Sequence, residues 1–359
     1  MKKISKIIVI IQRSNGDVFL SLSLINQLKK KYKNAQIDLL VNDDTVLVAE
    51  LLPNVNSIYT FSYLKKQKNR FKQEKTLFFA LFKKYDLSIN LTASDRSVIY
   101  ALLFGHNSIS AIESDNKKSW WKRKLLTYYY YFDNSKHILL NNLQPLNLLG
   151  IEHENVQSAI NFDQTKVSKV KARLNDNSIF NFLIFHPSAQ YDYKIYPKHL
   201  RFELLKLLNS LKIPIIVTGS NSSIDLRIKK EIPNLSNVYN FIGETSLQDF
   251  IILSDLSLGY IGMDTLNMHI AASQNKRIFA IFGPTNLAMW SPWSNKLKAS
   301  SAINKPLQTY GCNTIFQASL PCVACGKAGC DDNHGKSDCL FTILPEKIFN
   351  EIETWVKSV

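Results

Sequence analysis

Long hydrophobic runs are absent from this 359-residue sequence. No stretch approaches the roughly 18 to 20 uncharged apolar residues that a membrane-crossing helix requires. The apolar run at residues 7–11 is too short for a secretory signal, and Gln12 and Arg13 follow it without a small-residue cleavage site. We therefore expect this run to form a buried first strand.

Cysteine is scarce, and the number of cysteines is odd. The chain has five, four of them clustered near the C-terminus, which is a poor disulfide framework for a secreted protein. We expect a protein of the reducing cytoplasm.

Acidic residues are few relative to basic ones. Lys plus Arg number 44 and Asp plus Glu 29, so the formal net charge is +15. A positive field favours anionic partners, such as nucleotides, phosphorylated glycolipids, nucleic acid or an anionic membrane face. The composition, 45% hydrophobic and 20% charged, excludes a mainly disordered chain, and the length suits two domains.

What the sequence does contain is one recurring pattern of apolar run, turn and amphipathic helix. Strands are predicted at residues 7–11, 37–41, 55–61 and 87–91, and again at 182–185, 213–218, 256–261 and 278–282. Residues 114–136 are less regular, and the polar stretch 163–177 suits a bridge between domains. The pattern predicts an α/β fold with two Rossmann-like halves, whose parallel sheets face a central cleft.

Asn15-Gly16-Asp17 follows the first predicted strand. Ligands of parallel sheets bind beyond the carboxyl ends of the strands, so Asp17 either projects toward a ligand or caps the next helix. A G-x-G-x-x-G motif is missing from this turn, which argues against a nicotinamide dinucleotide.

Three strand ends of the second half carry candidate phosphate ligands. Asp264-Thr265 opens a helix whose free N–H groups attract phosphate, with His269 one turn inside. Gly283 follows the next strand and would allow a close approach to the backbone. Lys194, in a strand-to-helix loop, is either a phosphate ligand or an ordinary surface lysine. The alternative for the helix is a plain cap and a packed histidine.

Two further clusters are open to more than one interpretation. Cys322, Cys325, Cys330 and Cys339 surround His334 and suit a structural zinc or iron site, or else a reduced loop without metal. The basic run 117–124, with its tryptophans, lacks any nucleic-acid-binding motif and fits a solvated helix face, a membrane-proximal patch or an anionic-acceptor patch.

Taken together and in order, these motifs resemble those of the glycosyltransferase family 9 heptosyltransferases, the ADP-heptose:lipopolysaccharide enzymes. The resemblance covers about residues 6–355 and is strongest at Gly16-Asp17 and at 243–285. The motifs that carry it are Ser14-Asn15-Gly16-Asp17-Val18, Tyr85-Asp86-Leu87, Asp95-Arg96-Ser97, His186-Pro187-Ser188, Lys194-x-x-Pro197, Gly243-Glu244-Thr245-Ser246-Leu247, Asp264-Thr265-x-x-Met268-His269, Phe282-Gly283-Pro284-Thr285 and the Cys-x2-Cys tail.

The resemblance implies a GT-B fold and an inverting transfer without a catalytic metal. It implies an acceptor-binding domain at 1–165, a nucleotide-sugar domain at 178–344 with a Cys-rich segment at 312–339, and a C-terminal helix at 345–359 that could pack back on the first domain. Asp17 would be the general base. The donor contacts would be Gly16, Lys194, Asp225, Thr245, Leu247, Asp264, Thr265, Leu266, His269 and Gly283. Arg96, Lys122 and Arg123 would contact the acceptor. Leu266 stands where the family usually has glycine.

The expected function is heptosyl transfer from ADP-heptose to a lipopolysaccharide inner-core acceptor, at the cytoplasmic face of the inner membrane. One alternative is the same fold acting on a protein, on another glycan or with another nucleotide sugar. A second alternative is a nucleotide- or glycan-binding protein without catalysis. Nucleic acid is not an expected partner.

Overall fold

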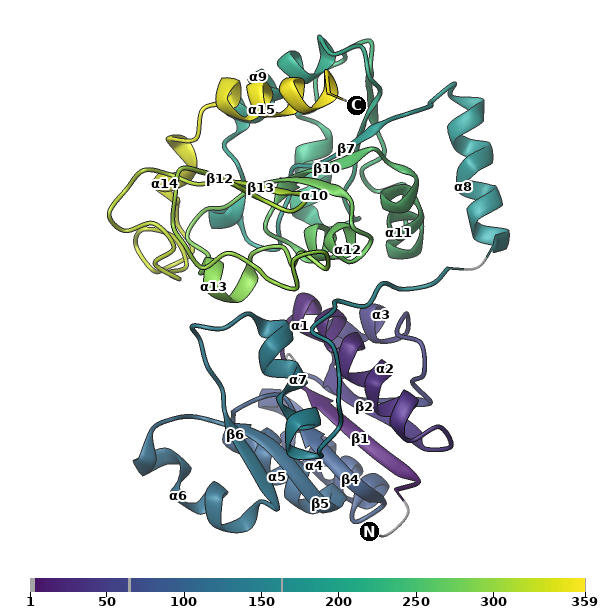
Figure 1. Cartoon of the computed structure of the whole chain (residues 1–359), viewed down its shortest axis with the longest axis vertical. Coiled ribbons are helices and arrows are strands. Elements are labelled where there is room, and N and C mark those ends of the chain that lie inside the picture. The colour runs from purple at the N-terminus through teal and green to yellow at the C-terminus, as the bar shows by residue number, and fades with distance from the viewer. Residues whose placement is uncertain (1–3, 64–65, 163, 359) are drawn as a thin grey trace. The chain divides into compact units, whose positions relative to one another are not determined.

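The computed structural model describes residues 4–63, 66–162 and 164–358. The chain divides into two compact units, Met1–Ile160 and Asn161–Val359 (Figure 1). Each unit is built around one sheet, six-stranded in the first and seven-stranded in the second. The predicted α/β class with two Rossmann-like halves is confirmed, and the first unit ends just before the predicted boundary at 165.

The first sheet is entirely parallel, with the strand order β3-β2-β1-β4-β5-β6. Ile7, Ile8, Val9 and Ile10 of its central strand are fully buried, as expected where helices cover both faces. Its strands are β1 (Lys6–Ile11), β2 (Gln36–Asn42), β3 (Ser57–Phe61), β4 (Tyr85–Asn90), β5 (Gly105–Ile112) and β6 (Tyr128–Tyr131). Its helices are α1 (Asn15–Leu20), α2 (Leu22–Lys31), α3 (Val46–Ala49), α4 (Lys66–Leu81), α5 (Asp95–Phe104), α6 (Asn116–Leu125) and α7 (Ile138–Leu148).

The strand order of the first sheet reverses between β1 and β4. In open parallel sheets, ligands bind at the carboxyl ends of the strands that flank such a reversal. The segment after β1 carries Asp17, and the segment after β4 carries Arg96. Both residues therefore lie at the edge where parallel sheets of this kind bind their ligands.

The second sheet has the order β12-β13-β11-β10-β7-β8-β9 and is parallel except for its edge strand β12, which is antiparallel to β13. The strands are β7 (Leu183–His186), β8 (Ile215–Val217), β9 (Val238–Asn240), β10 (Gly259–Met263), β11 (Arg277–Ile281), β12 (Leu307–Tyr310) and β13 (Asn313–Phe316). The helices are α8 (Gln164–Asp176), α9 (Lys198–Asn209), α10 (Ser223–Lys229), α11 (Leu247–Leu256), α12 (Leu266–Ser273), α13 (Leu287–Trp290), α14 (Asp338–Phe341) and α15 (Pro345–Val356).

The second sheet reverses its order between β7 and β10. The carboxyl end of β7 leads to Lys194, and that of β10 leads to Asp264 and α12. Gly262 in β10 is required by close packing, because a Cβ there would lie 2.4 Å from the His186 carbonyl oxygen. The strands therefore bring the predicted donor-binding loops to one edge.

The C-terminal helix belongs to the second unit, and the expectation that it could also pack back on the first stays a prediction. Helix α15 packs along α9, and Figure 1 shows the two side by side. Its residues Ile348 and Ile352 are fully buried in the core of the second unit. The Trp355 ring lies 5.6 Å from that of Phe279 in β11.

Two segments are more regular than predicted. The irregular stretch 114–136 contains α6 and the edge strand β6. The predicted bridge begins at Asp163, which lies outside the described residues, and its remainder is mostly α8. This helix buries Val167, Val170 and Leu174 and packs against α11. Its polar composition concealed a narrow apolar stripe at helical spacing.

Within the described ranges, every helix is either too short or too polar to span a bilayer.

Candidate functional site

Asp17 lies in the first turn of α1 and is only 3% exposed. Its Oδ2 accepts hydrogen bonds from the Ser14 backbone N–H (3.2 Å) and hydroxyl (2.7 Å), as the acidic residue of a capping box does. Its Oδ1 forms an ion pair with Arg13 Nε at 2.7 Å. Asp17 thus caps the helix with one oxygen, while the other oxygen is paired with Arg13.

The surroundings of Asp17 increase its basicity. Burial raises the pKa of its carboxyl above the ordinary value, and the Arg13 charge and the Ser14 hydrogen bonds oppose this only in part. The Arg13 guanidinium is itself held against the Phe132 ring, 4.7 Å from its centroid. Gly16 occupies the same helical turn. A carboxylate with a raised pKa is the better proton acceptor.

Arg96, at the same sheet edge, is held by aromatic rings. Its guanidinium lies 4.0 Å from the ring centroid of Phe61 and 4.4 Å from that of Tyr63, and it donates a hydrogen bond to the Tyr63 hydroxyl. Such contacts fix the direction of a cationic group. Arg123, on α6, is half-buried and donates to the Tyr131 hydroxyl at 3.4 Å.

Lys122 does not have the exposed position expected of an acceptor ligand. Its side chain is fully buried, with Nζ 2.6 Å from Asp95 Oδ1 and 2.6 Å from Glu113 Oε2. It also donates to the Ala93 carbonyl oxygen at 3.2 Å. A buried charge must be paired, and these two carboxylates do so. In this structure Lys122 ties α6 to the segments that follow β4 and β5.

Lys194 and Asp264 meet at the reversal point of the second sheet. Lys194 Nζ lies 3.2 Å from Asp264 Oδ2, with the carboxylate 8% and the lysine side chain 28% exposed. Burial alone would lower the pKa of Lys194, but the attraction of Asp264 outweighs it and the pKa is raised. Lys194 therefore carries a full positive charge at neutral pH.

Two buried histidines lie in the same unit, and one of them, His269, feels the charges of both Asp264 and Lys194. Burial lowers the pKa of His269 to about 4, against an opposing effect of Asp264. Burial likewise lowers the pKa of His186 to about 4. The ring nitrogen Nδ1 of His186 lies 3.0 Å from both the Thr218 hydroxyl and the Asn267 side-chain nitrogen. Both imidazoles are neutral at pH 7 and serve as polar, uncharged groups.

Helix α12 begins beside Asp264. Thr265 is its N-cap residue by backbone conformation but makes no capping hydrogen bond with its side chain to any described residue. An N-terminus without a side-chain cap is suited to an anion. Leu266, the first residue of α12, is partly exposed.

Asp225 organises the loop between β8 and α10. Its Oδ2 accepts hydrogen bonds from the Ser220 backbone N–H (2.8 Å) and the Ser222 hydroxyl (3.0 Å). Its buried Oδ1 accepts none from the residues described here. The carboxylate therefore has one oxygen that holds the loop and one buried oxygen that accepts no hydrogen bond from the described residues.

The remaining predicted donor contacts lie on nearby loops of the same unit. Thr245 lines a cavity of about 140 Å³ together with Phe241 and Arg173, whose guanidinium stacks 3.8 Å from the Phe241 ring centroid. Leu247 begins α11 and does not line that cavity. Gly283 is buried, and a Cβ there would come within 3.1 Å of Leu340.

The four predicted metal-binding cysteines are neighbours but do not form a metal centre. Cys339 is buried and the other three are exposed. Burial, with smaller effects from the thiols of Cys330, Cys325 and Cys322, raises the pKa of Cys339 to about 11. No three His, Cys, Asp or Glu side chains in the described ranges are arranged to hold a metal ion. The thiols suit zinc or iron chemically, but their positions here do not fit a bound ion.

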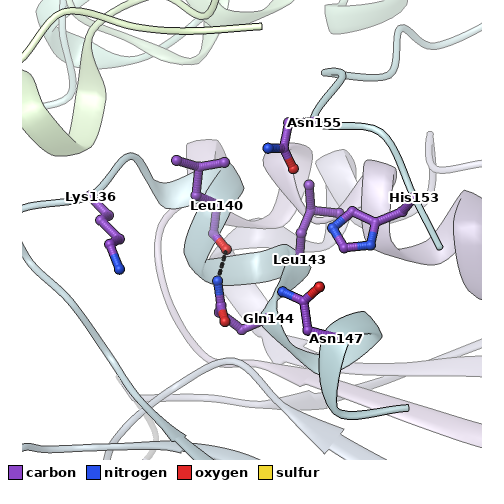
Figure 2. Close-up of a pocket in the computed structure, with 7 residues that line it drawn as sticks. All are labelled: Lys136, Leu140, Leu143, Gln144, Asn147, His153 and Asn155. Carbon is purple, nitrogen blue, oxygen red and sulfur yellow. Dashed lines mark hydrogen bonds between the residues drawn. The ribbon is translucent and has the colours of Figure 1, made fainter. Parts of the chain in front are cut away.

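A second cavity, of about 360 Å³, lies in the first unit beside α7 (Figure 2). Its lining is mostly polar and consists of Lys136, Leu140, Leu143, Gln144, Asn147, His153 and Asn155. The sequence predicted none of these residues as part of a site, because no recognisable motif precedes α7. It also missed Arg13, whose only sequence signal is its position four residues before Asp17.

Comparisons with known proteins give this geometry a family context. The family profile "Glycosyltransferase family 9 (heptosyltransferase)" matches residues 75–318, which is more than half of the chain. A lipopolysaccharide heptosyltransferase 3 of Escherichia coli is 26% identical over 295 residues, covering 79% of this chain and 85% of the relative.

Solved structures agree on the fold. The E. coli ADP-heptose lps heptosyltransferase II superposes with a TM-score of 0.70 at 19% identity, over 97% of this chain and 98% of the other. The E. coli heptosyltransferase WaaC with ADP gives 0.69 at 14% identity, over 97% and 99%. The protein is therefore a glycosyltransferase of the GT-B fold. Within that class, the chain belongs to glycosyltransferase family 9, the heptosyltransferases.

Proposed function

We propose that this protein transfers heptose from ADP-heptose to an acceptor in the lipopolysaccharide inner core. The family and the names of its relatives support this donor and this acceptor class. The observation that carries the proposal is the Lys194–Asp264 pair beside the start of α12 at the reversal point of the second sheet. This is where a nucleotide diphosphate would bind in such a sheet.

The proposed reaction is a single displacement with inversion at the anomeric carbon. Asp17 Oδ1 takes the proton of the acceptor hydroxyl while that oxygen forms the new bond to the anomeric carbon. The bond from this carbon to the donor phosphate oxygen breaks, and ADP leaves with the electron pair. The raised pKa of Asp17 favours this role, because it makes the carboxylate a stronger base.

Stabilisation of the leaving diphosphate is assigned to Lys194 and the first N–H groups of α12, which begins after Thr265. A fixed ammonium and oriented N–H groups neutralise developing negative charge without reorganisation. This supports a mechanism that needs no catalytic metal ion.

Other donor contacts follow from the same unit. We assign Asp264 and the neutral His269 to sugar hydroxyls, and Asp225 Oδ1 to a ribose hydroxyl. Thr245 and Leu247 would lie near the adenine. Leu266, Gly283 and, from the first unit, Gly16 would border the donor.

Acceptor binding is assigned to the first unit. Arg96 and Arg123 are cationic groups held by aromatic partners and suit the phosphates of an inner-core glycolipid. Lys122 would contribute indirectly, by holding Asp95 and Glu113. Contact with the cytoplasmic face of the inner membrane would run through α6 and β6, where Trp120, Leu125 and Tyr128 are exposed.

A structural metal at Cys322, Cys325, Cys330 and Cys339 stays a separate prediction. Binding would require the thiols to move together from the positions described above. Elemental analysis of the purified protein tests it, and the absence of stoichiometric zinc and iron would reject it.

The test of function is incubation with ADP-heptose and core acceptors that lack heptose, in the presence and absence of EDTA. We expect ADP release coupled to the addition of one heptose to the acceptor, unaffected by EDTA, with no turnover of the matched acceptor that already carries the heptose. ADP binding without product on any core acceptor would contradict the proposal.

A further inference from the structure

Residues 322–341, which hold the four clustered cysteines of the predicted segment 312–339 and extend through α14, touch two loops of the proposed donor site. From here on, the name Cys-rich segment means these residues. The segment lies between β13 and α15. Its contacts with the donor loops are of two kinds, one aromatic and one through the backbone.

The aromatic contact is made by His334. Its ring centroid lies 5.8 Å from that of Tyr191 and 5.6 Å from that of Tyr193. The two tyrosines stack on each other at 5.4 Å with an interplanar angle of 14°. The three rings form one cluster at the base of the loop that carries Lys194.

That loop has little freedom of its own. Tyr193 immediately precedes Lys194, and Asp192 forms an ion pair with Arg227 of α10. Asp192, Tyr193 and Lys194 form a single short 3₁₀ turn. A displacement of the Tyr191–Tyr193 stack would therefore move the Lys194 backbone with it. The Lys194–Asp264 distance of 3.2 Å therefore depends on where the stack is held.

The backbone contact reaches the Gly283 turn. The Gly326 N–H donates to the Pro284 carbonyl oxygen at 2.7 Å. Leu340, also in the Cys-rich segment, is buried against Gly283, where an added Cβ would lie only 3.1 Å from the Leu340 side chain. The segment thus contacts the loops after β7 and β11, on both sides of Asp264.

The part of the segment that carries His334 is itself well defined. Asp331 Oδ1 accepts the N–H groups of Asn333 (2.9 Å) and Gly335 (3.1 Å), and the His334 N–H donates to the Ala328 carbonyl oxygen at 2.7 Å. His334 adopts a left-handed backbone conformation, with φ of 63°. A loop cross-linked in this way presents its ring in a fixed direction.

We propose that His334 is a positioning residue, which holds the Tyr191–Tyr193 stack and so sets the place of Lys194 for the donor diphosphate. The Cys-rich segment is then a brace for the donor site rather than an independent appendage. The inference rests on the proposed function, in that Lys194 is taken as a ligand of the donor.

The test is the affinity for ADP and the steady-state kinetics of His334→Asn. Asparagine tolerates the left-handed conformation but lacks the ring. We expect the dissociation constant for ADP and the donor KM to rise about three- to tenfold, the effect of losing an aromatic contact, with kcat changed less. His334→Tyr, which keeps a ring, should restore most of the affinity.

Two controls separate the outcomes. Asn333→Ala, an exposed neighbour whose backbone bond is kept, should bind ADP as the wild type does. In a Lys194→Ala background, His334→Asn should have no further effect, because the two changes act on the same contact. Wild-type ADP affinity in His334→Asn, or an equal loss in both backgrounds, would overturn the inference alone. Wild-type affinity in Lys194→Ala would instead overturn the donor role of Lys194 in the proposed function.

Discussion

At the scale of single residues, the structural role of Asp17 conflicts with the burial of its charge. Its Oδ2 completes the capping box of α1, while burial makes the ionised carboxylate costly. Because its folded-state pKa is raised, stability is greatest below the unfolded-state pKa and is lost as the pH rises through the folded-state pKa. At neutral pH the ionised Asp17 therefore destabilises the first unit.

Asp17→Asn should consequently preserve or raise the midpoint of thermal unfolding at pH 7. The amide oxygen can still accept the Ser14 hydrogen bonds, and the cost of burying a charge is removed. The expected gain is a few degrees, at about 2–4 °C per kcal/mol for units of this size. Calorimetry of the variant and of wild type checks this, and a clear drop in the midpoint would show that the Arg13 ion pair outweighs burial.

The two buried histidines predict a loss of stability in acid. Their folded-state pKa of about 4 is below the ordinary value of 6.5, so stability falls as the pH is lowered from 6.5 toward 4. Each histidine contributes up to about 3 kcal/mol to that fall. Unfolding midpoints at pH 7 and pH 5 should differ less in His186→Gln than in wild type. An unchanged difference would contradict a neutral, buried His186.

The residue type alone could not tell a charged side chain that binds a ligand from one that pairs with another side chain inside the fold. The sequence placed Lys122 among basic residues on a helix, where a solvated side chain is the ordinary outcome. Its partners Asp95 and Glu113 lie 27 and nine residues away along the chain and meet only in the folded sheet. Asp17 is a different case: its position after a buried first strand indicated either a ligand contact or a helix cap, and the structure shows the cap.

At the scale of elements, the sequence predicted strands that are continuous apolar runs. It did not predict strands in which polar residues interrupt the apolar ones. Strand β1 was found because Ile7–Ile11 is purely apolar. Strand β5 was missed because Ser108 and Ser110 interrupt its apolar residues, and those serines are buried through hydrogen bonds with Thr127, Asn90 and Ala111. Thr127 and Asn90 lie far from these serines in the sequence, so no local pattern predicts the strand.

Helix α15 gives a prediction at this scale. Ile352 is fully buried against the core of the second unit, so Ile352→Ala should lower its free energy of unfolding by roughly 2–5 kcal/mol. The exposed Thr354→Ala on the same helix is the matched control and should change it little. Differential scanning calorimetry measures both variants. Equal effects would mean that α15 does not pack as described.

At the scale of the whole molecule, the charge of +15 and the exposed aromatic residues of α6 predict binding to anionic membranes. Trp120 is 55% exposed, with Lys124 Nζ 5.6 Å from its ring centroid. We expect sedimentation with vesicles containing phosphatidylglycerol, reduced in Trp120→Ala and by added salt. Phe202→Ala, an exposed aromatic residue of α9 beside Lys206, is the control. Equal loss in both variants would place the contact elsewhere.

In the proposed function, the first unit supplies the general base and the second unit binds most of the donor. A change in the first unit should therefore reduce turnover without reducing donor affinity. The most direct measurement is the rate of ADP-heptose turnover and the ADP dissociation constant of Asp17→Ala beside those of wild type. We predict that turnover falls by at least about 10²-fold while the ADP dissociation constant stays within twofold. Equal losses of turnover and ADP affinity, or near-normal turnover, would contradict Asp17 as the general base.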